Sequence, residues 1–474
     1  NVRLLNAGST LVNEAGSQFN ISGTSRQMYG AGNFDNSGVL SVGLTDALQV
    51  LTISNSMVNN GTVSVETGEL RLAGSATHTG DFTGSVDSVL NFSGGNQIFD
   101  AGSSITASTV RFSNQTFGGG NFTINGTYDV GNTEVVANTV EFDAAATTGT
   151  LTQTGGVLSG TDTLTVTGLT TFSNGTMSGE GTTRAEGGLL LDGGFSDIWG
   201  NRTLVNVGGQ TANWTAGNVR LLNAGSTLVN EAGSQFNISG TSRQMYGTGD
   251  FNNDGNITVN TSDNAQVISF LNLNNSGSVD VQQGAVHSTN LNFINNGSIR
   301  VADGARMSGV RDIENSTSGL FSGEGLIDPG ANFTFTNAGR INPGDGVGEL
   351  TVDGDLAMTT TSIFNVELGG LDNFDLLSVT GDSNLDGTIN VFLVDGFIPE
   401  VGQTFDVLLT EALFGEFASV ISQNPGILWE MQYILNEEGM DIARLGVSAV
   451  PIPAAGWLLL SGLGVLVGIG RRLS

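Results

Sequence analysis

Few residues in this 474-residue chain have the types and spacing that catalysis or metal binding requires. The two histidines, His78 in ATHTG and His287 in AVHST, stand alone, and each fits a surface or groove position better than a catalytic or metal-binding one. The absence of cysteine excludes disulfides, thiolate nucleophiles and Cys-based metal sites. All 15 basic residues are arginines, so there is no lysine to act as a base. We therefore expect no catalytic residues, no bound metal and no cofactor.

One segment is similar to a calcium-binding loop. In GDSNLDGTIN, Asp382, Asn384 and Asp386 match the first three ligand positions of such a loop, and Gly387 matches its turn glycine. Position 12, which should be an acidic ligand, is Leu393, and the residues before it alternate like a strand. We interpret this segment as a hairpin turn and expect only weak calcium binding by the acidic surface.

A carbohydrate-active enzyme must be considered as an alternative to a non-enzymatic protein. Polysaccharide lyases and hydrolases occur on β-solenoids, which are folds whose chain winds through stacked coils of short strands. Paired-carboxylate hydrolysis needs two acidic side chains on one face, and adjacent coils could supply them at many places. A lyase would have to use an arginine as its base, since the chain has no lysine. No Asp-Asp cluster with a nearby His-Gly is present. We therefore predict that the chain is not an enzyme.

The composition indicates a folded, acidic protein with a systematic use of glycine. The chain has 71 glycines but only 6 prolines, and 38% of its residues are apolar, which is enough for a core. Its 45 acidic and 15 basic residues give a net charge of −30. Such a charge repels phosphate backbones, so nucleic acid is not an expected partner.

A large block of the sequence is duplicated. Residues 1–30 recur without a change at 218–247, an offset of 217 residues. The second copy follows NWTAG without a break, whereas the first copy begins the chain. We therefore expect further sequence, including any export leader, to precede Asn1.

A shorter repeat runs through the same region. Segments such as FNNDGNITV and LNNSGSVDV each combine an Asn-containing turn, a glycine and alternating apolar residues. Their glycines are spaced by 20 or 22 residues, at Gly233, Gly255, Gly277, Gly297, Gly319 and Gly339. Each unit suits two or three short strands joined by tight turns, in which Asn and Gly tolerate a positive φ. Residues 1–340 therefore predict a parallel β-solenoid of about 20–23 residues per coil, with Val and Ile inside and asparagine ladders along its axis.

The segment 341–447 has fewer glycines and longer apolar alternation. The stretches GELTVDGDL, SIFNVELGG, FDLLSVTGDSNLDGTINV and GQTFDVLLTEALFGEFASV resemble the end region of autotransporter-type and large adhesin-like passenger proteins. The resemblance implies a β cap on the solenoid. Such a cap is physically needed, because the last coil would otherwise expose an apolar end and an unpaired strand edge.

The tail, residues 448–474, has three ordered features. A short proline motif is followed by an uncharged stretch at 454–470 and then by a basic pair. The tail resembles the PEP-CTERM class of sorting signals in its Val-Pro-Leu-Pro-Ala variant, which implies a short transmembrane helix and processing by an exosortase-type enzyme of a Gram-negative bacterium. A plain anchor helix or a buried strand are the alternatives, and the glycines and prolines disfavour the strand. The motif residues are Val450, Pro451, Ile452, Pro453 and Ala454, and the basic stop is Arg471 and Arg472.

Together these features predict an exported structural or adhesive protein of the cell surface, outer membrane or extracellular matrix. Its expected partners are the membrane, through the tail, and an extracellular polysaccharide or cell surface, through the repeats. A polysaccharide lyase or hydrolase on the same scaffold is the alternative function.

Overall fold

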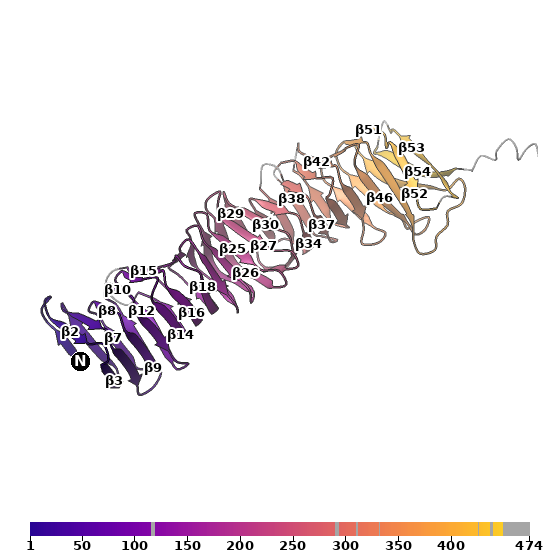
Figure 1. The fold of residues 1–474 in the computed structure, drawn as a ribbon. Coiled ribbons are helices and arrows are strands. Elements are labelled where there is room, and N and C mark those ends of the chain that lie inside the picture. Colours follow the sequence, from indigo (N-terminus) through magenta and orange to yellow (C-terminus); the bar gives the residue numbers. More distant parts are fainter. Residues whose placement is uncertain are drawn as a thin grey trace, which may run out of the picture. The chain divides into compact units, whose positions relative to one another are not determined.

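The computed structural model describes residues 1–114, 119–289, 293–309, 311–330, 332–424, 426–436 and 439–448. These residues form strands and turns without a helix, so none of them forms a helix that could cross a membrane. The chain divides into two units, 1–313 and 314–474. Within each unit the strands stack as parallel rungs (Figure 1). The predicted all-β parallel β-solenoid is therefore confirmed.

Each coil of the first unit contributes a strand to each of three parallel ladders, here called A, B and C. Several long strands turn a corner and contribute one half to each of two ladders, for example β14 and β26. The first three C strands of the chain, β2, β5 and β8, form a small sheet of their own.

Ladder A consists of β3 (Gln18–Gly23), β6 (Val39–Leu44), β9 (Thr62–Leu72), β11 (Asp81–Gly84), β14 (Ser104–Phe112), β16 (Thr127–Val135), β18 (Ala146–Gln153), β20 (Thr163–Val166), β23 (Thr182–Ala185), β25 (Thr203–Asn206), β27 (Thr227–Asn230), β30 (Asp250–Asn253), β33 (Leu273–Asn275) and β36 (Phe293–Asn295). Ladder B also uses halves of β9, β14, β16 and β18, and its other strands are β1 (Val2–Leu4), β4 (Arg26–Gly30), β7 (Val50–Ile53), β12 (Ser88–Phe92), β21 (Thr170–Phe172), β24 (Leu189–Ile198), β26 (Thr211–Leu221), β28 (Gln235–Gly240), β31 (Asn256–Thr261), β34 (Ser278–Gln283) and β37 (Ser298–Val301). Ladder C also uses halves of β24 and β26, and its other strands are β2 (Thr10–Asn13), β5 (Asn33–Asn36), β8 (Met57–Asn59), β10 (Ala76–His78), β13 (Gln97–Phe99), β15 (Asn121–Ile124), β17 (Thr139–Phe142), β19 (Val157–Ser159), β22 (Gly175–Met177), β29 (Arg243–Gly247), β32 (Val267–Phe270), β35 (Ala285–Ser288) and β38 (Arg306–Gly309).

The second unit has three parallel ladders of its own, D, E and F, and β39 (Ile313–Asn315) spans the division between the units in the chain. Ladder D consists of β42 (Thr334–Asn337), β45 (Asp355–Met358), β48 (Ser383–Leu385) and β51 (Leu413–Gly415). Ladder E consists of β40 (Leu320–Gly323), β43 (Arg340–Pro343), β46 (Ile363–Leu368), β49 (Thr388–Leu393) and β52 (Ser419–Ser422). Ladder F consists of β41 (Leu326–Asp328), β44 (Glu349–Val352), β47 (Leu376–Val379) and β50 (Thr404–Thr410).

Parallel pairing continues past residue 340, where the sequence suggested a change from repeats to a cap. Antiparallel pairing involves β50, β53 (Leu428–Ile434) and β54 (Asp441–Ser448), with β54 lying between the other two. The strand β54 covers the edge of β50 that a further coil would otherwise occupy. After residue 341 the coils are longer and contain fewer glycines, so the corners differ from those of the earlier coils. The strands nevertheless still pair in parallel ladders.

Alternation of side chains builds the core as the sequence predicted. In SIRV of β37, Ile299 and Val301 are fully buried, whereas Ser298 and Arg300 lie on the outer side. The Thr- and Gly-rich middle of the chain keeps the same pattern, and its phenylalanines pack against one another. The rings of Phe112 and Phe122, for example, are 5.4 Å apart between centroids.

The predicted asparagine ladders lie inside the solenoid. In the first unit the side-chain amides of Asn206, Asn230, Asn253, Asn275 and Asn295 form a continuous row, each donating to the next at 2.8 Å. All five side chains have no exposed surface. A buried amide satisfies its polar groups at low cost when an identical amide lies one coil away, so the repeat itself makes this row favourable.

The corner glycines have a different role from the one that the sequence suggested. Gly255, Gly277 and Gly297 do not have a positive φ, unlike Gly233. A Cβ atom on Gly277 would lie 2.0 Å from the carbonyl oxygen of Gly255, and one on Gly297 would lie 2.0 Å from that of Gly277. Glycine is required at these corners because successive coils approach each other closely there, and not because the backbone bends into the left-handed region.

The two copies of the duplicated block form the same strands on different ladders. QFNISG is β3 of ladder A in the first copy and β28 of ladder B in the second, while ladder A at that level carries TLVN, β27. The two QFNISG strands are therefore separated by ten complete coils, from β3 to β27 along ladder A, and by one further strand, from β27 to β28. Coil lengths vary along the way, for example 18 residues between Tyr128 and Ala146 and 25 between Gln97 and Phe122. Identical sequences thus face different sides of one solenoid.

Candidate functional site

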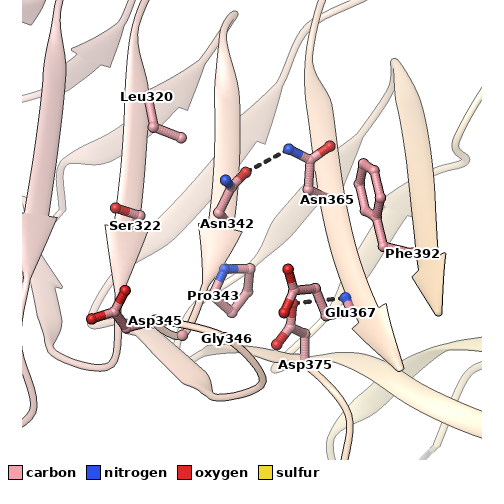
Figure 2. A pocket seen from close by; sticks show the side chains of 11 residues that line it. Leu320, Ser322, Asn342, Pro343, Asp345, Gly346, Asn365, Glu367, Asp375 and Phe392 are labelled. Carbon is pink, nitrogen blue, oxygen red and sulfur yellow. Dashed lines mark hydrogen bonds between the residues drawn. The ribbon is translucent and has the colours of Figure 1, made fainter. Parts of the chain in front are cut away.

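A polar groove lies on the outer side of ladder E in the second unit (Figure 2). Its volume is about 290 Å³. Strands β43 and β46 supply Asn342 and Asn365, whose side-chain amides are joined by a hydrogen bond of 2.6 Å, and β49 supplies Phe392. Carboxylates of Asp345 and Glu367 line the same groove. Because alternate residues of a strand point outward, neighbouring coils place these groups side by side.

A glycine-rich loop forms one wall of the groove. After β43 the chain passes through Gly344 and Gly346, both with a positive φ, which only glycine adopts at no cost. The loop is held at both ends, since the amide of Gly344 donates to the carbonyl of Gly323 at 2.8 Å and the amide of Gly348 donates to Asp375 at 2.9 Å. The sequence NPGDGVG therefore encodes a fixed wall that presents Asp345.

Asp375 is the carboxyl group that holds one end of this loop, through Gly348. Its side chain is 1% exposed, and its oxygens accept hydrogen bonds from the backbone amides of Gly348 at 2.9 Å and Glu367 at 2.8 Å. Burial raises the pKa of Asp375 to about 7, and the charge of Glu367 adds to this rise, whereas the two amides oppose it. Near neutral pH, Asp375 is therefore present in both protonation states.

The groove is better suited to binding than to catalysis. Carboxylates and amides at its surface can exchange hydrogen bonds with hydroxyl or amino groups of a ligand. Hydrolysis of a glycoside would need one carboxyl group that donates a proton to the substrate. Asp375 has the raised pKa of such an acid, but its buried oxygens are already bonded to Gly348 and Glu367.

Searches of protein-family models and of curated protein sequences were made with the whole chain. Neither search finds a match.

The residues that the sequence singled out do not meet in one site. The tail motif, Val450 to Ala454, and the basic stop, Arg471 and Arg472, lie outside the described residues. Among the residues that are described, no group of three or more His, Asp or Glu side chains is arranged to hold a metal ion.

The segment with the partial calcium motif is a corner of the solenoid. Asp382 precedes β48, and Gly387 lies between β48 and β49, which belong to ladders D and E and do not pair with each other. The interpretation as a hairpin is therefore wrong, because the two strands lie on different faces of one coil. The carboxylate of Asp386 accepts a hydrogen bond from the backbone amide of Gly387 at 2.7 Å, as is common in tight turns.

His78 is buried, which corrects the expectation of a surface or groove position. Its Nδ1 accepts from the backbone amide of Asn59 at 3.2 Å, and its Nε2 therefore donates to Gln97, also at 3.2 Å. The ring stacks on Phe99, and burial lowers the pKa of His78 to about 4. His287 lies on the outer side of β35, where Nδ1 is 2.9 Å from the hydroxyl of Ser308.

Sequence reasoning missed the groove. Asp345, Glu367 and Asp375 are separated along the chain, and only stacking of the coils brings them to one cavity. The glycine spacing of NPGDGVG was the available signal, since glycines that flank an aspartate after a strand often mark a loop with a fixed shape.

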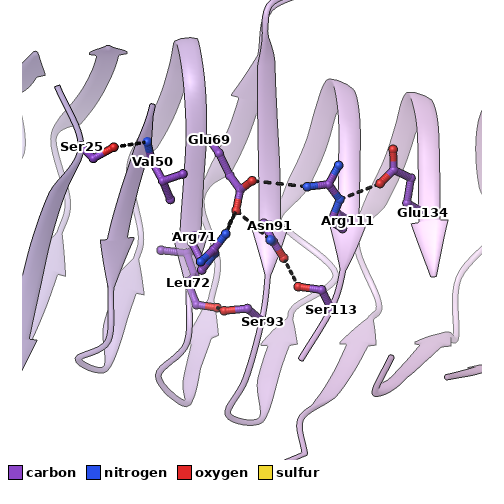
Figure 3. Close-up of polar contacts among 10 residues, drawn as sticks. All are labelled: Ser25, Val50, Glu69, Arg71, Leu72, Asn91, Ser93, Arg111, Ser113 and Glu134. Carbon is purple, nitrogen blue, oxygen red and sulfur yellow. Dashed lines mark hydrogen bonds and ion pairs between the residues drawn. The ribbon is translucent and has the colours of Figure 1, made fainter. Parts of the chain in front are cut away.

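Arginines on the first unit are used in a network of surface ion pairs (Figure 3). Glu69 accepts from Arg71 at 2.6 Å, from Asn91 at 2.8 Å and from Arg111 at 3.3 Å, and Arg111 also donates to Glu134 at 2.6 Å. These residues extend over strands β9, β12, β14 and β16, so the network joins neighbouring coils from the outside. Its charges are mutually neutralised, which favours a structural role.

The stability of the second unit should fall as pH rises through neutrality. The pKa of Asp375 is raised in the folded protein from 3.8 to about 7, so its contribution is complete below about pH 4 and is lost as pH rises through 7. We expect a loss on the order of 1–3 kcal/mol between pH 5 and pH 8, measurable as a lower unfolding midpoint.

Glu367→Gln is the matched variant for this prediction. This variant removes the neighbouring charge that raises the pKa of Asp375. The unfolding midpoint should therefore begin to fall at a lower pH than in the unmodified protein. Asp375→Asn removes the titrating group itself, and an unchanged pH profile in that variant would contradict the assignment to Asp375.

Proposed function

We propose that this chain is an exported structural or adhesive protein that presents a long, regular β-solenoid surface at the cell surface or in the extracellular matrix. The observation that supports this most directly is the construction of the solenoid. Buried rows of identical asparagine amides and close-packed glycine corners repeat from coil to coil, which makes a stiff scaffold. Its outer side presents mostly neutral Ser, Thr and Asn side chains, which suits contact with a polymer.

Export and sorting are proposed from the tail sequence. The motif Val450 to Ala454, the uncharged stretch 454–470 and the pair Arg471 and Arg472 resemble a PEP-CTERM signal, so the tail would anchor the chain in the inner membrane until an exosortase-type enzyme cleaves it. The proposed location after cleavage is the cell surface, the outer membrane or the extracellular matrix.

Cell fractionation with intact-mass analysis of the C-terminus tests the proposal. We expect the mature protein outside the inner membrane and lacking Arg471, Arg472 and the residues after them. Replacement of Pro451 and Pro453 by alanine should leave the full-length chain in the inner membrane. A mature protein that retains its C-terminal Arg-Arg-Leu-Ser in the inner membrane would overturn the proposed sorting.

A carbohydrate-active enzyme is the second candidate, favoured by the raised pKa of Asp375 beside Glu367 in the groove. Incubation with neutral and acidic polysaccharides distinguishes the two functions. We expect no product from the unmodified protein. Release of oligosaccharides that disappears in Glu367→Gln but persists in Glu430→Gln, a variant outside the groove, would favour the enzyme.

A further inference from the structure

A second surface of the first unit has the features of a binding face. Two large aromatic side chains are exposed at the end of β24, Phe195 within the strand to 45% and Trp199 directly after it to 55%. They point outward with Asp197 between them, because alternate residues of a strand face the same side. Exposed aromatic rings are costly in water, so two rings this close together along the chain indicate a surface that contacts another molecule.

One of the two aromatic side chains, Phe195, is held in place by the next coil. Arg220 of β26 pairs in register with Asp197, and its guanidinium donates two hydrogen bonds of 2.6 Å to that carboxylate. The same guanidinium lies 4.6 Å from the centre of the Phe195 ring. The ring of Phe195 is therefore supported from one side by a cation that is itself fixed, and the local charges of Arg220 and Asp197 cancel.

Hydrogen-bonding groups continue the surface over the following coils. Asn218 is the partner of Phe195 in register, and its side-chain oxygen accepts from the backbone amide of Gln244 at 2.9 Å. A shallow cavity of about 290 Å³ lies beside these residues and is lined by Asn218, Ser242, Arg243, Gln244, Val267 and Ser269. Arg243 is buried, and its guanidinium donates to the backbone carbonyls of Trp214 and Ser239. Aromatic rings next to amides and hydroxyls form one face on β24, β26, β29 and β32, in which the Arg220–Asp197 pair is neutralised and Arg243 is buried against backbone carbonyls.

We propose that this face binds a neutral polysaccharide. Phe195 and Trp199 offer apolar faces to the C–H sides of sugar rings, while Asn218, Gln244 and Ser269 can bind sugar hydroxyls in the cavity. Rings four residues apart on a strand are separated by about 13 Å, which suits an extended chain more than a single sugar. The net charge of −30 repels acidic polysaccharides, so the ligand is neutral.

This site deepens the proposed function and rests on it, since it assigns the adhesive contact to one face and one ligand class. Affinity electrophoresis of the full chain in gels that contain dextran, a soluble neutral β-glucan or alginate provides the test. We expect retardation by at least one neutral glucan and none by alginate. The double variant Phe195→Ala with Trp199→Ala should lose about tenfold or more in affinity.

Two controls separate binding from folding. Phe414→Ala removes an aromatic ring that is 56% exposed on the second unit, and it should leave retardation unchanged. Trp199→Phe keeps a ring at the site and should retain most of the binding. Equal retardation of the double variant and the unmodified protein would overturn this site while leaving an adhesive function in place.

The remaining outcomes also decide the proposal. Retardation by alginate alone, or by no polymer in the panel, would overturn the neutral-polysaccharide site. The proposed export is tested independently by the fractionation experiment, so its failure is distinguishable from a failure of this site.

Discussion

Gly277→Ala is expected to destabilise the first unit by about 3 kcal/mol or more, the size of effect caused by severe overpacking. The added Cβ would lie 2.0 Å from the carbonyl oxygen of Gly255 and 2.7 Å from the carbonyl carbon of Asp254. Both contacts are with backbone, so no side chain can move aside. The coils would have to separate locally, which would lengthen the ladder hydrogen bonds on both sides of the corner.

Thermal unfolding and amide hydrogen exchange measure this effect. We expect a lower unfolding midpoint and faster exchange in β30, β33 and β36, since stability in a stacked repeat protein depends on contacts between neighbouring coils. Gly102→Ala is the matched control, because a Cβ at Gly102 would have no atom within 4 Å and the change should cost less than about 0.5 kcal/mol. Equal midpoints for the two variants would show that the corner is not close-packed.

Asn253→Ala should destabilise the same unit by about 2–4 kcal/mol, because it interrupts a fully buried hydrogen-bonded row. The amide of Asn253 accepts from Asn230 and donates to Asn275, each at 2.8 Å, and it also donates to the carbonyl of Ser278 at 3.1 Å. Its removal leaves the fully buried side chains of Asn230 and Asn275, and the part-buried carbonyl of Ser278, without this partner.

The neighbouring Asn274→Ala is the control for this row. Asn274 also bonds to an asparagine of the adjacent coil, Asn252, at 2.8 Å, but it does so on the exposed side of β33. Water replaces the lost partner there, so we expect a change of less than about 0.5 kcal/mol. Similar midpoints for Asn253→Ala and Asn274→Ala would contradict a stabilising role for the buried row.

Asn253→Asp adds a test that depends on pH. An ionised aspartate can still accept from Asn230, but it faces the oxygens of Asn275 and Ser278 without a proton to donate. Burial should raise the pKa of this carboxyl group in the folded protein, so the variant should be least stable at neutral pH and recover part of its stability in acid. A pH-independent midpoint difference from the unmodified protein would oppose this explanation.

The repeating part of the fold was accessible from sequence because each coil carries the same local instructions. The Asn-containing turns predicted the buried rows through Asn230 and Asn253, and the alternation in segments such as SIRV predicted which residues form the core. The candidate sites were not accessible in this way. Glu367 and Asp375 in the groove, or Phe195 and Arg220 on the proposed binding face, meet only because separate coils are in a particular register.

The sequence by itself determined where the strands and corners of this protein lie, and the duplicated block demonstrates this. Residues 1–30 and 218–247 form the same strands at the same positions of the repeat, because periodicity and turn residues act over a few residues. Only the tertiary structure decided which face each strand occupies. That choice depends on the number of corners in the intervening 217 residues, so the identical segment QFNISG lies on ladder A in one copy and on ladder B in the other.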